Sequence, residues 1–154
     1  MADPLVETWE IHARIHHYLL DAIPLKALDA VAASGGRNVA EAFAHIHNVR
    51  LMWLKAAAPE LLAGLEKIEK EPGIKPATLT RALEASAKAI GALIERSLAA
   101  GGKVKGFKPH VHAFVGYLIA HESHHRGQIA LALKQAKQPL DKKVAYGLWE
   151  WGSR

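Results

Sequence analysis

The sequence contains no cysteine among its 154 residues. Disulfide bonds, thiolate metal ligands and a covalent cysteine mechanism are therefore excluded. Any metal ligand that the protein supplies must be a nitrogen or an oxygen atom. A thiol that takes part in the chemistry must arrive as a co-substrate.

Long apolar runs and targeting signals are also missing. No stretch reaches the roughly eighteen consecutive apolar residues of a transmembrane helix, so we expect no membrane partner. The first ten residues, MADPLVETWE, lack the basic and apolar regions of a signal peptide, which favours a cytoplasmic protein.

Basic residues exceed acidic ones, but they do not form a pattern that binds nucleic acid. The formal net charge is +5, and the densest basic group is Lys103, Lys105 and Lys108. No basic stripe carries interleaved aromatic residues, which make up only 6% of the chain. The sequence therefore argues against a nucleic-acid partner.

Alanine and leucine dominate the composition, and this bias predicts an all-α protein. The spacing of apolar residues predicts long amphipathic helices over residues 5–22, 38–57, 78–100 and 108–137. Asn38, with Glu41 three residues later, predicts a capping box, and Thr78 is a second predicted N-cap. The length suits one domain, so we expect a single four-helix bundle over residues 1–154.

Two weaker helical signals and a C-terminal tail complete this expected bundle. Short helical segments are expected within residues 25–33 and 60–69. The tail after Pro139 holds Tyr146, Leu148, Trp149 and Trp151. Because this is a large aromatic surface, the tail should pack back on the bundle or on a partner chain.

Two histidines lie in the middle of the last predicted helix. One stripe of that helix consists of Val111, Phe114, Leu118, His121, His125, Gln128 and Ala132. The Cβ atoms of His121 and His125, four residues apart, should lie about 5–6 Å from each other, so both rings can share one divalent ion. Buried imidazoles on an apolar stripe need such a partner.

A third ligand is required, because catalytic zinc sites combine three protein ligands with an open position. His45 is the first candidate, since it lies on the face of the second long helix that we expect to point inward. His47 lies on a more polar flank with Arg50. It is the alternative, because a small rotation of the helix would exchange the two histidines.

A second histidine pair, His12 and His16, lies on an apolar face of the first helix. We interpret these residues as partly buried histidines at the edge of the bundle. The alternative is that they line the mouth of the same pocket.

Residues 121–125, HESHH, also match the H-E-x-x-H motif of zinc peptidases, in which Glu122 would be the general base. Zinc peptidases usually place this helix beside a sheet, and no strand is predicted, so this function is a minor alternative. Otherwise we expect Glu122 on the solvent side, or behind the metal ligands where it orients a ring N–H or pairs with Arg126.

Two segments, RNVAEAFAHI (37–46) and HESHHRGQI (121–129), resemble the DinB/YfiT-like family of metal-dependent enzymes. That family has a histidine on its second helix and H-x-x-x-H-x-G-Q on the last bundle helix. Arg37 stands where the family often has tryptophan. The resemblance implies a four-helix bundle in which His45, His121 and His125 bind a nickel or zinc ion completed by water. It also implies a homodimer.

The leading functional expectation is a metal-dependent enzyme, in which the ion is a Lewis acid that lowers the pKa of water or of a thiol. The resemblance implies a thiol-dependent S-transferase or isomerase acting on a small electrophilic molecule, with a low-molecular-weight thiol as co-substrate. A water nucleophile would instead make the protein a hydrolase. The contrasting expectation is a non-catalytic, stress-related protein that binds a metal or a small ligand on the same scaffold.

Overall fold

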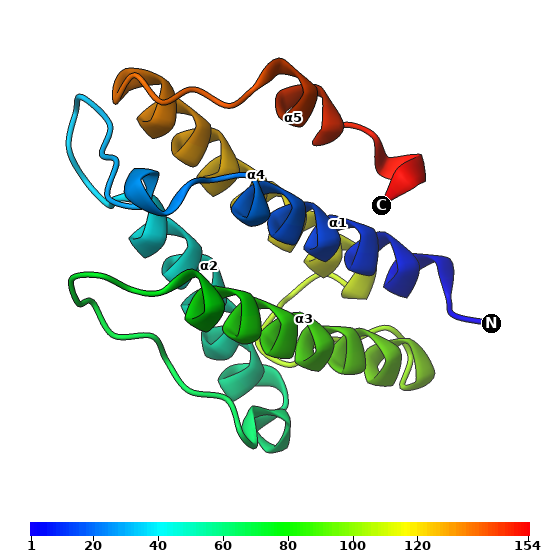
Figure 1. The fold of residues 1–154 in the computed structure, drawn as a ribbon. Coiled ribbons are helices and arrows are strands. Elements are labelled where there is room, and N and C mark those ends of the chain that lie inside the picture. Colours follow the sequence, from blue (N-terminus) through cyan, green and yellow to red (C-terminus); the bar gives the residue numbers. More distant parts are fainter.

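The computed structural model describes all residues, 1–154, as a bundle of helices (Figure 1). The long helices are α1 (Pro4–Asp21), α2 (Val39–Ala57), α3 (Pro76–Ala99) and α4 (Val111–Gln135). The short segments are the 3-10 helices η1 (Leu25–Ala27), η2 (Pro59–Leu62) and η3 (Trp151–Ser153), and the helix α5 (Lys142–Gly147). No β-strand forms, so the predicted all-α four-helix bundle is confirmed.

The four long helices form a closed arrangement, in which α3 and α4 also contact each other. Helix α3 packs against α1 and α2, and α4 packs against α2 and α1. None of these helices combines the length and the hydrophobicity that crossing a lipid bilayer requires.

Local capping interactions determine where the helices begin. Asn38 Oδ1 accepts a hydrogen bond from Glu41 N (2.8 Å) and Glu41 Oε1 accepts one from Asn38 N (3.2 Å), which confirms the predicted capping box. The predicted N-cap at Thr78 was wrong, because α3 already begins at Pro76. Helix α4 begins at Val111, where the His110 ring accepts a hydrogen bond from the Ala113 N–H.

The core consists of two apolar clusters with a polar layer between them. One cluster includes Leu19 and Phe43, and the other includes Trp9 and Phe114. The residues between these clusters, at the middle of all four long helices, are buried and polar; they are His12, His16, Arg50, Ser86 and Glu122. We call this set the polar layer.

Helix α2 buries a wider face than the predicted one, because Ala42 and Ile46 of the predicted inward face are buried together with residues of the predicted flank. Phe43, His47, Arg50 and Leu54 are all buried, whereas His45 is only half-buried. The prediction that His47 and Arg50 lie on a polar flank was therefore wrong. The buried face extends as far as Arg50, whose guanidinium pairs with the buried carboxylate of Glu122.

The C-terminal tail returns alongside α1 (Figure 1). The Arg154 guanidinium lies 3.8 Å from the centre of the Tyr18 ring, and Arg14 donates to the Arg154 carbonyl (3.2 Å). Tyr146 and Trp149 nevertheless remain 70% and 80% exposed. The expected packing of the tail on the bundle therefore holds for its backbone and for Arg154, but not for these two aromatic side chains.

Candidate metal centre

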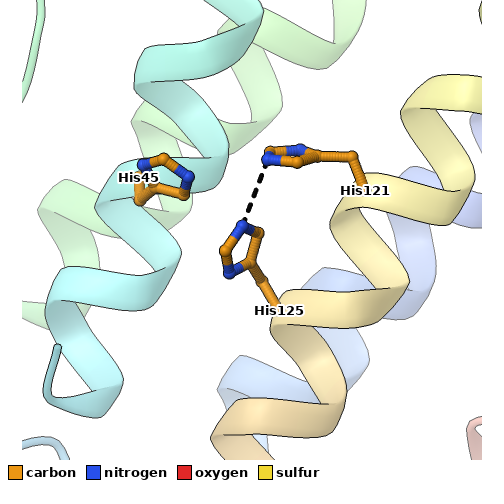
Figure 2. Close-up of side chains that lie close together, drawn as sticks. All are labelled: His45, His121 and His125. Carbon is orange, nitrogen blue, oxygen red and sulfur yellow. Dashed lines mark hydrogen bonds between the residues drawn. The ribbon is translucent and has the colours of Figure 1, made fainter. Parts of the chain in front are cut away.

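Three histidines from two helices converge at the middle of the bundle (Figure 2). His45 comes from α2, and His121 and His125 come from consecutive turns of α4. Their ligand nitrogens lie within 4.8 Å of one another, and the Nε2 atoms of His121 and His125 are 3.1 Å apart. The structure thus brings together the three histidines that sequence spacing singled out.

The positions of these nitrogens fit a divalent ion. Two ligands of a tetrahedral zinc ion, each about 2.0–2.1 Å from the metal, lie about 3.3 Å apart, close to the observed separation of the two Nε2 atoms. His125 Nδ1 donates to Gln128 Oε1 (2.8 Å), which leaves the lone pair of Nε2 directed at the group. His121 Nδ1 is buried without a hydrogen-bond partner. An ion bound to the Nε2 atoms of His121 and His125 would give these buried rings a polar partner.

The surroundings keep these three rings in the neutral form that metal ligands require. Burial, together with the charge of Arg37, lowers the pKa of His45 to about 4. Burial also lowers the pKa of His121 and of His125, and the positive charge of Arg37 acts in the same direction on both. Protons therefore compete weakly with a metal ion at this position.

The environment of the group is open on one side and apolar on another. His45 and His121 are half-buried, so a small molecule can reach them. The Tyr117 ring stacks on His121 with an interplanar angle of 14°, and Trp53 packs edge-on against Tyr117. An ion held here would therefore be accessible to a small molecule and would have aromatic side chains near one of its ligands.

A second group of ligand atoms lies inside the polar layer. His12, His16 and Glu122 are each at most 1% exposed, and their ligand atoms also lie within 4.8 Å of one another, so this group could hold a metal ion. Both Nε2 atoms lie about 3 Å from Glu122 Oε1, at 3.0 Å and 2.9 Å. The prediction that His12 and His16 are partly buried residues at the bundle edge was wrong, because both are fully enclosed.

Two arginines make the second group less suited to a cation than the first. Arg50 donates to both oxygens of Glu122, at 2.7 Å and 2.9 Å, and is itself fully buried. Arg126 lies 3.2 Å from His12 and 3.4 Å from His16. A divalent ion would have to displace the Arg50 guanidinium from Glu122 and would lie close to the charge of Arg126. The positive partner of the Glu122 carboxylate is therefore already present in the protein.

Glu122 is an ionised carboxylate in the interior. Burial alone would raise its pKa, but the charge of Arg50 and the hydrogen bonds from His12 and His16 hold the pKa well below its usual range. The expectation of a solvent-side glutamate paired with Arg126 was wrong: Glu122 is 1% exposed, and its guanidinium partner is Arg50. Its carboxylate accepts from His12 and His16 rather than orienting His121 or His125.

This orientation of Glu122 also argues against the zinc-peptidase alternative. A general base must reach the molecule that it deprotonates, whereas both Glu122 oxygens are bound to Arg50 inside the polar layer. The absence of strands removes the sheet beside which such a helix normally lies.

His47, the alternative third ligand, is directed elsewhere. Its Nε2 lies 2.8 Å from the backbone carbonyl oxygen of Glu66, which anchors the loop after η2. It belongs to neither group of converging ligand atoms. The geometry therefore favours His45 as the helix-α2 residue of the candidate centre.

Sequence reasoning missed Arg50 as a member of the interior. Arg50 Nη1 donates to the Leu83 carbonyl (2.9 Å) and to Ser86 Oγ (3.1 Å), so α3 also contributes to the polar layer. His12, His16 and Ser86 are polar residues on apolar stripes, which is a signal in the sequence, whereas Arg50 lies on a polar flank of its helix and gives no such signal.

Comparison with known proteins supports the family assignment that these residues suggest. The family model of the DinB family matches residues 1–139, which include all four long helices and both histidine groups. No curated protein and no solved structure shows a significant match. The chain belongs to the DinB family.

Proposed function

We propose that the protein is a metal-dependent enzyme that uses His45, His121 and His125 to bind a divalent ion. In this proposal it transfers a low-molecular-weight thiol to a small electrophilic molecule. The observation that carries the proposal is the convergence of three neutral imidazoles at a half-buried position that a small molecule can reach.

Bound there, a zinc or nickel ion would supply a Lewis acid that favours the deprotonated form of a thiol or of water. The residues of the chain would bind the ion and orient its ligands. Gln128 fixes the orientation of the His125 ring through its Nδ1–H. Tyr117 lies nearly parallel to the His121 ring, with the two ring centroids 6.4 Å apart.

A thiol is favoured over water as the nucleophile because of where Glu122 lies. Metal-dependent hydrolysis commonly uses a carboxylate as a general base near the ion, and Glu122 is bound to Arg50 instead. A thiol requires less help, because its ordinary pKa is about 8.5, far below that of water. The chain has no cysteine, so this thiol would be a co-substrate.

Metal analysis tests the centre. We expect about one zinc or nickel ion per chain, lost in His121→Ala and His125→Ala and retained in His112→Ala, which changes an exposed histidine of the same helix. The melting temperature should fall when a chelator removes the ion. Metal that survives His125→Ala but is lost in His16→Gln would place the site in the polar layer and contradict the proposal.

A screen of electrophilic substrates with and without added thiols tests the reaction. We expect turnover only when both the metal and a thiol are present. Turnover without any thiol would indicate a hydrolase. Metal binding without turnover across the screen would favour the non-catalytic metal-binding alternative.

A further inference from the structure

A cavity lies between the loop before α2 and the C-terminal half of α4, next to the residue that orients His125. It has a volume of about 210 Å³, and its lining includes Arg37, Ala42 and Gln128. Gln128 is the residue that orients His125, and Ala42 lies one helical turn before His45. A molecule in this cavity would therefore be separated from His125 by the Gln128 side chain and from His45 by one turn of α2.

A second cavity of about 210 Å³ lies on the other side of α2 and is lined by His45 itself. Arg37 lines this cavity too, so its side chain is shared by the first cavity and by the cavity that His45 lines. The other two cations of the second cavity have carboxylate partners. Lys70 lies 3.4 Å from Glu41, and Lys67 lies 3.9 Å from Glu69.

Arg37 differs from these lysines because it makes no hydrogen bond or ion pair with the protein. Its guanidinium is exposed, and its positive charge acts on all three histidines, whose pKa values it helps to lower. An unpaired guanidinium at the entrance to a binding site is suited to an anionic ligand, because it offers charge-assisted hydrogen bonds with little to displace.

The lining of the first cavity indicates which anion fits. Arg37 is its only charged residue, the other polar side chains are neutral, and half of the lining is hydrophobic. A planar carboxylate matches a single forked guanidinium, whereas a phosphate dianion would leave charge unpaired. A cavity of about 150 Å³ accommodates benzene, so this space suits a short organic acid.

We propose that Arg37 and the adjoining cavity bind the carboxylate of a small organic acid, whose reactive end then reaches the three histidines. Arg37 is thus a specificity-determining residue that selects carboxylate-bearing molecules over neutral ones. This inference rests on the proposed function, because it assigns a substrate class to the same centre.

The test compares two thiols of the same shape, 4-mercaptobutyrate and its neutral amide, on the cobalt-loaded protein. Thiolate binding is followed by its charge-transfer absorption, which requires no turnover. We expect the acid to bind on the order of tenfold more tightly than the amide, the size of one charge-assisted hydrogen bond. Arg37→Gln should abolish this preference, and Arg37→Lys should retain part of it.

Arg81→Gln is the matched control, because it removes an exposed arginine that lines neither cavity. It should keep the preference for the acid. Equal affinity for acid and amide in the wild-type protein, or a preference that survives Arg37→Gln, would overturn the inference while leaving the metal centre intact.

A second measurement keeps the two proposals separate. Propionate is titrated into the metal-free protein, and the Nε–H resonance of Arg37 is followed by NMR. A saturable shift of this resonance supports the carboxylate site even if no thiol band appears on cobalt, in which case only the proposed function fails. No shift at Arg37 would count against the carboxylate site.

Discussion

At the scale of single residues, Glu122 is the group on which most of the interior polar contacts depend. It joins α4 to His12 and His16 on α1 and to Arg50 on α2. Removing one partner of a buried ion pair leaves an uncompensated charge and strongly destabilises the fold, whereas the intact pair contributes little net stability. The Glu122–Arg50 pair should therefore be sensitive to the loss of either residue.

Glu122→Gln should destabilise the protein by about 3–5 kcal/mol, because it leaves the buried Arg50 without a charge partner. Urea unfolding measures this change. Glu95→Gln, at an exposed position of α3, is the control and should shift stability by no more than about 0.5 kcal/mol. A similar loss in both variants would refute a special role for the buried pair.

Gln128 should control metal affinity without being a ligand. Gln128→Leu removes the acceptor for His125 Nδ1–H, and we expect metal affinity to fall about 10–100-fold. Gln128→Glu keeps an acceptor and should bind at least as tightly as the wild type. Competition with a chromophoric chelator measures both, and unchanged affinity in the leucine variant would contradict this role.

The candidate site was predictable in part from individual residues. The spacing of His121 and His125 on one helix predicts that their rings meet, and the structure shows this. His45 was predicted together with His47 as its alternative, and only the helix rotation distinguishes them. Arg50 could not be placed, because a buried arginine depends on a partner 72 residues away.

At the scale of helices, the beginnings of α2 and α3 show how capping can be misread. Asn38 and Thr78 both precede apolar helical patterns, but only Asn38 caps a helix. Pro76 starts α3 two residues before Thr78, because proline is well suited to the first turn. The threonine therefore lies within the helix.

These two positions give opposite expectations for the same kind of substitution. Asn38→Ala should lower the free energy of unfolding by about 1 kcal/mol, because it removes the cap of α2. Thr78→Ala should leave stability unchanged or raise it slightly, because alanine has the higher helix propensity. Chemical denaturation compares them, and equal losses at the two sites would show that the capping assignment is wrong.

At the scale of the whole molecule, the polar layer makes stability dependent on pH. Burial lowers the pKa of His12 and sets that of His16 well below the usual value, among the charges of Glu122, Arg50 and Arg126. In the unfolded chain both histidines titrate near 6.5. Above that pH neither state binds the protons; below it the unfolded chain takes them up first, so acidification favours unfolding.

The free energy of unfolding should therefore be highest above about pH 6.5 and should fall as the pH drops toward the lowered pKa values of the two histidines. The expected slope is about 1.4 kcal/mol per pH unit for each of them. Urea unfolding at pH 7.5 and 5.5 measures the slope. His16→Gln removes one titrating group and should reduce it. A wild-type stability that does not change over this range would contradict the prediction.

The overall fold was more predictable than the interior. Helical periodicity gave four long helices and the bundle, because an apolar stripe of this length can be buried only against other helices. The helix α5 was not predicted, since six residues carry too little periodicity. The polar layer was missed because sequence patterns favour an apolar interior, whereas here charge pairing across helices overrides that preference.

Because His121 and Glu122 are consecutive, their side chains leave α4 about 100° apart, one toward each group. A single-residue insertion or deletion between Glu122 and His125 would turn His125 by about 100° relative to His121 and Glu122, and so would separate the two α4 histidines of the candidate centre. The length of α4 between these residues therefore matters more to the centre than the identity of its exposed side chains. A designer who transfers the three histidines into another bundle should also transfer Arg50 and Glu122, because their ion pair joins the two helices that present the histidines.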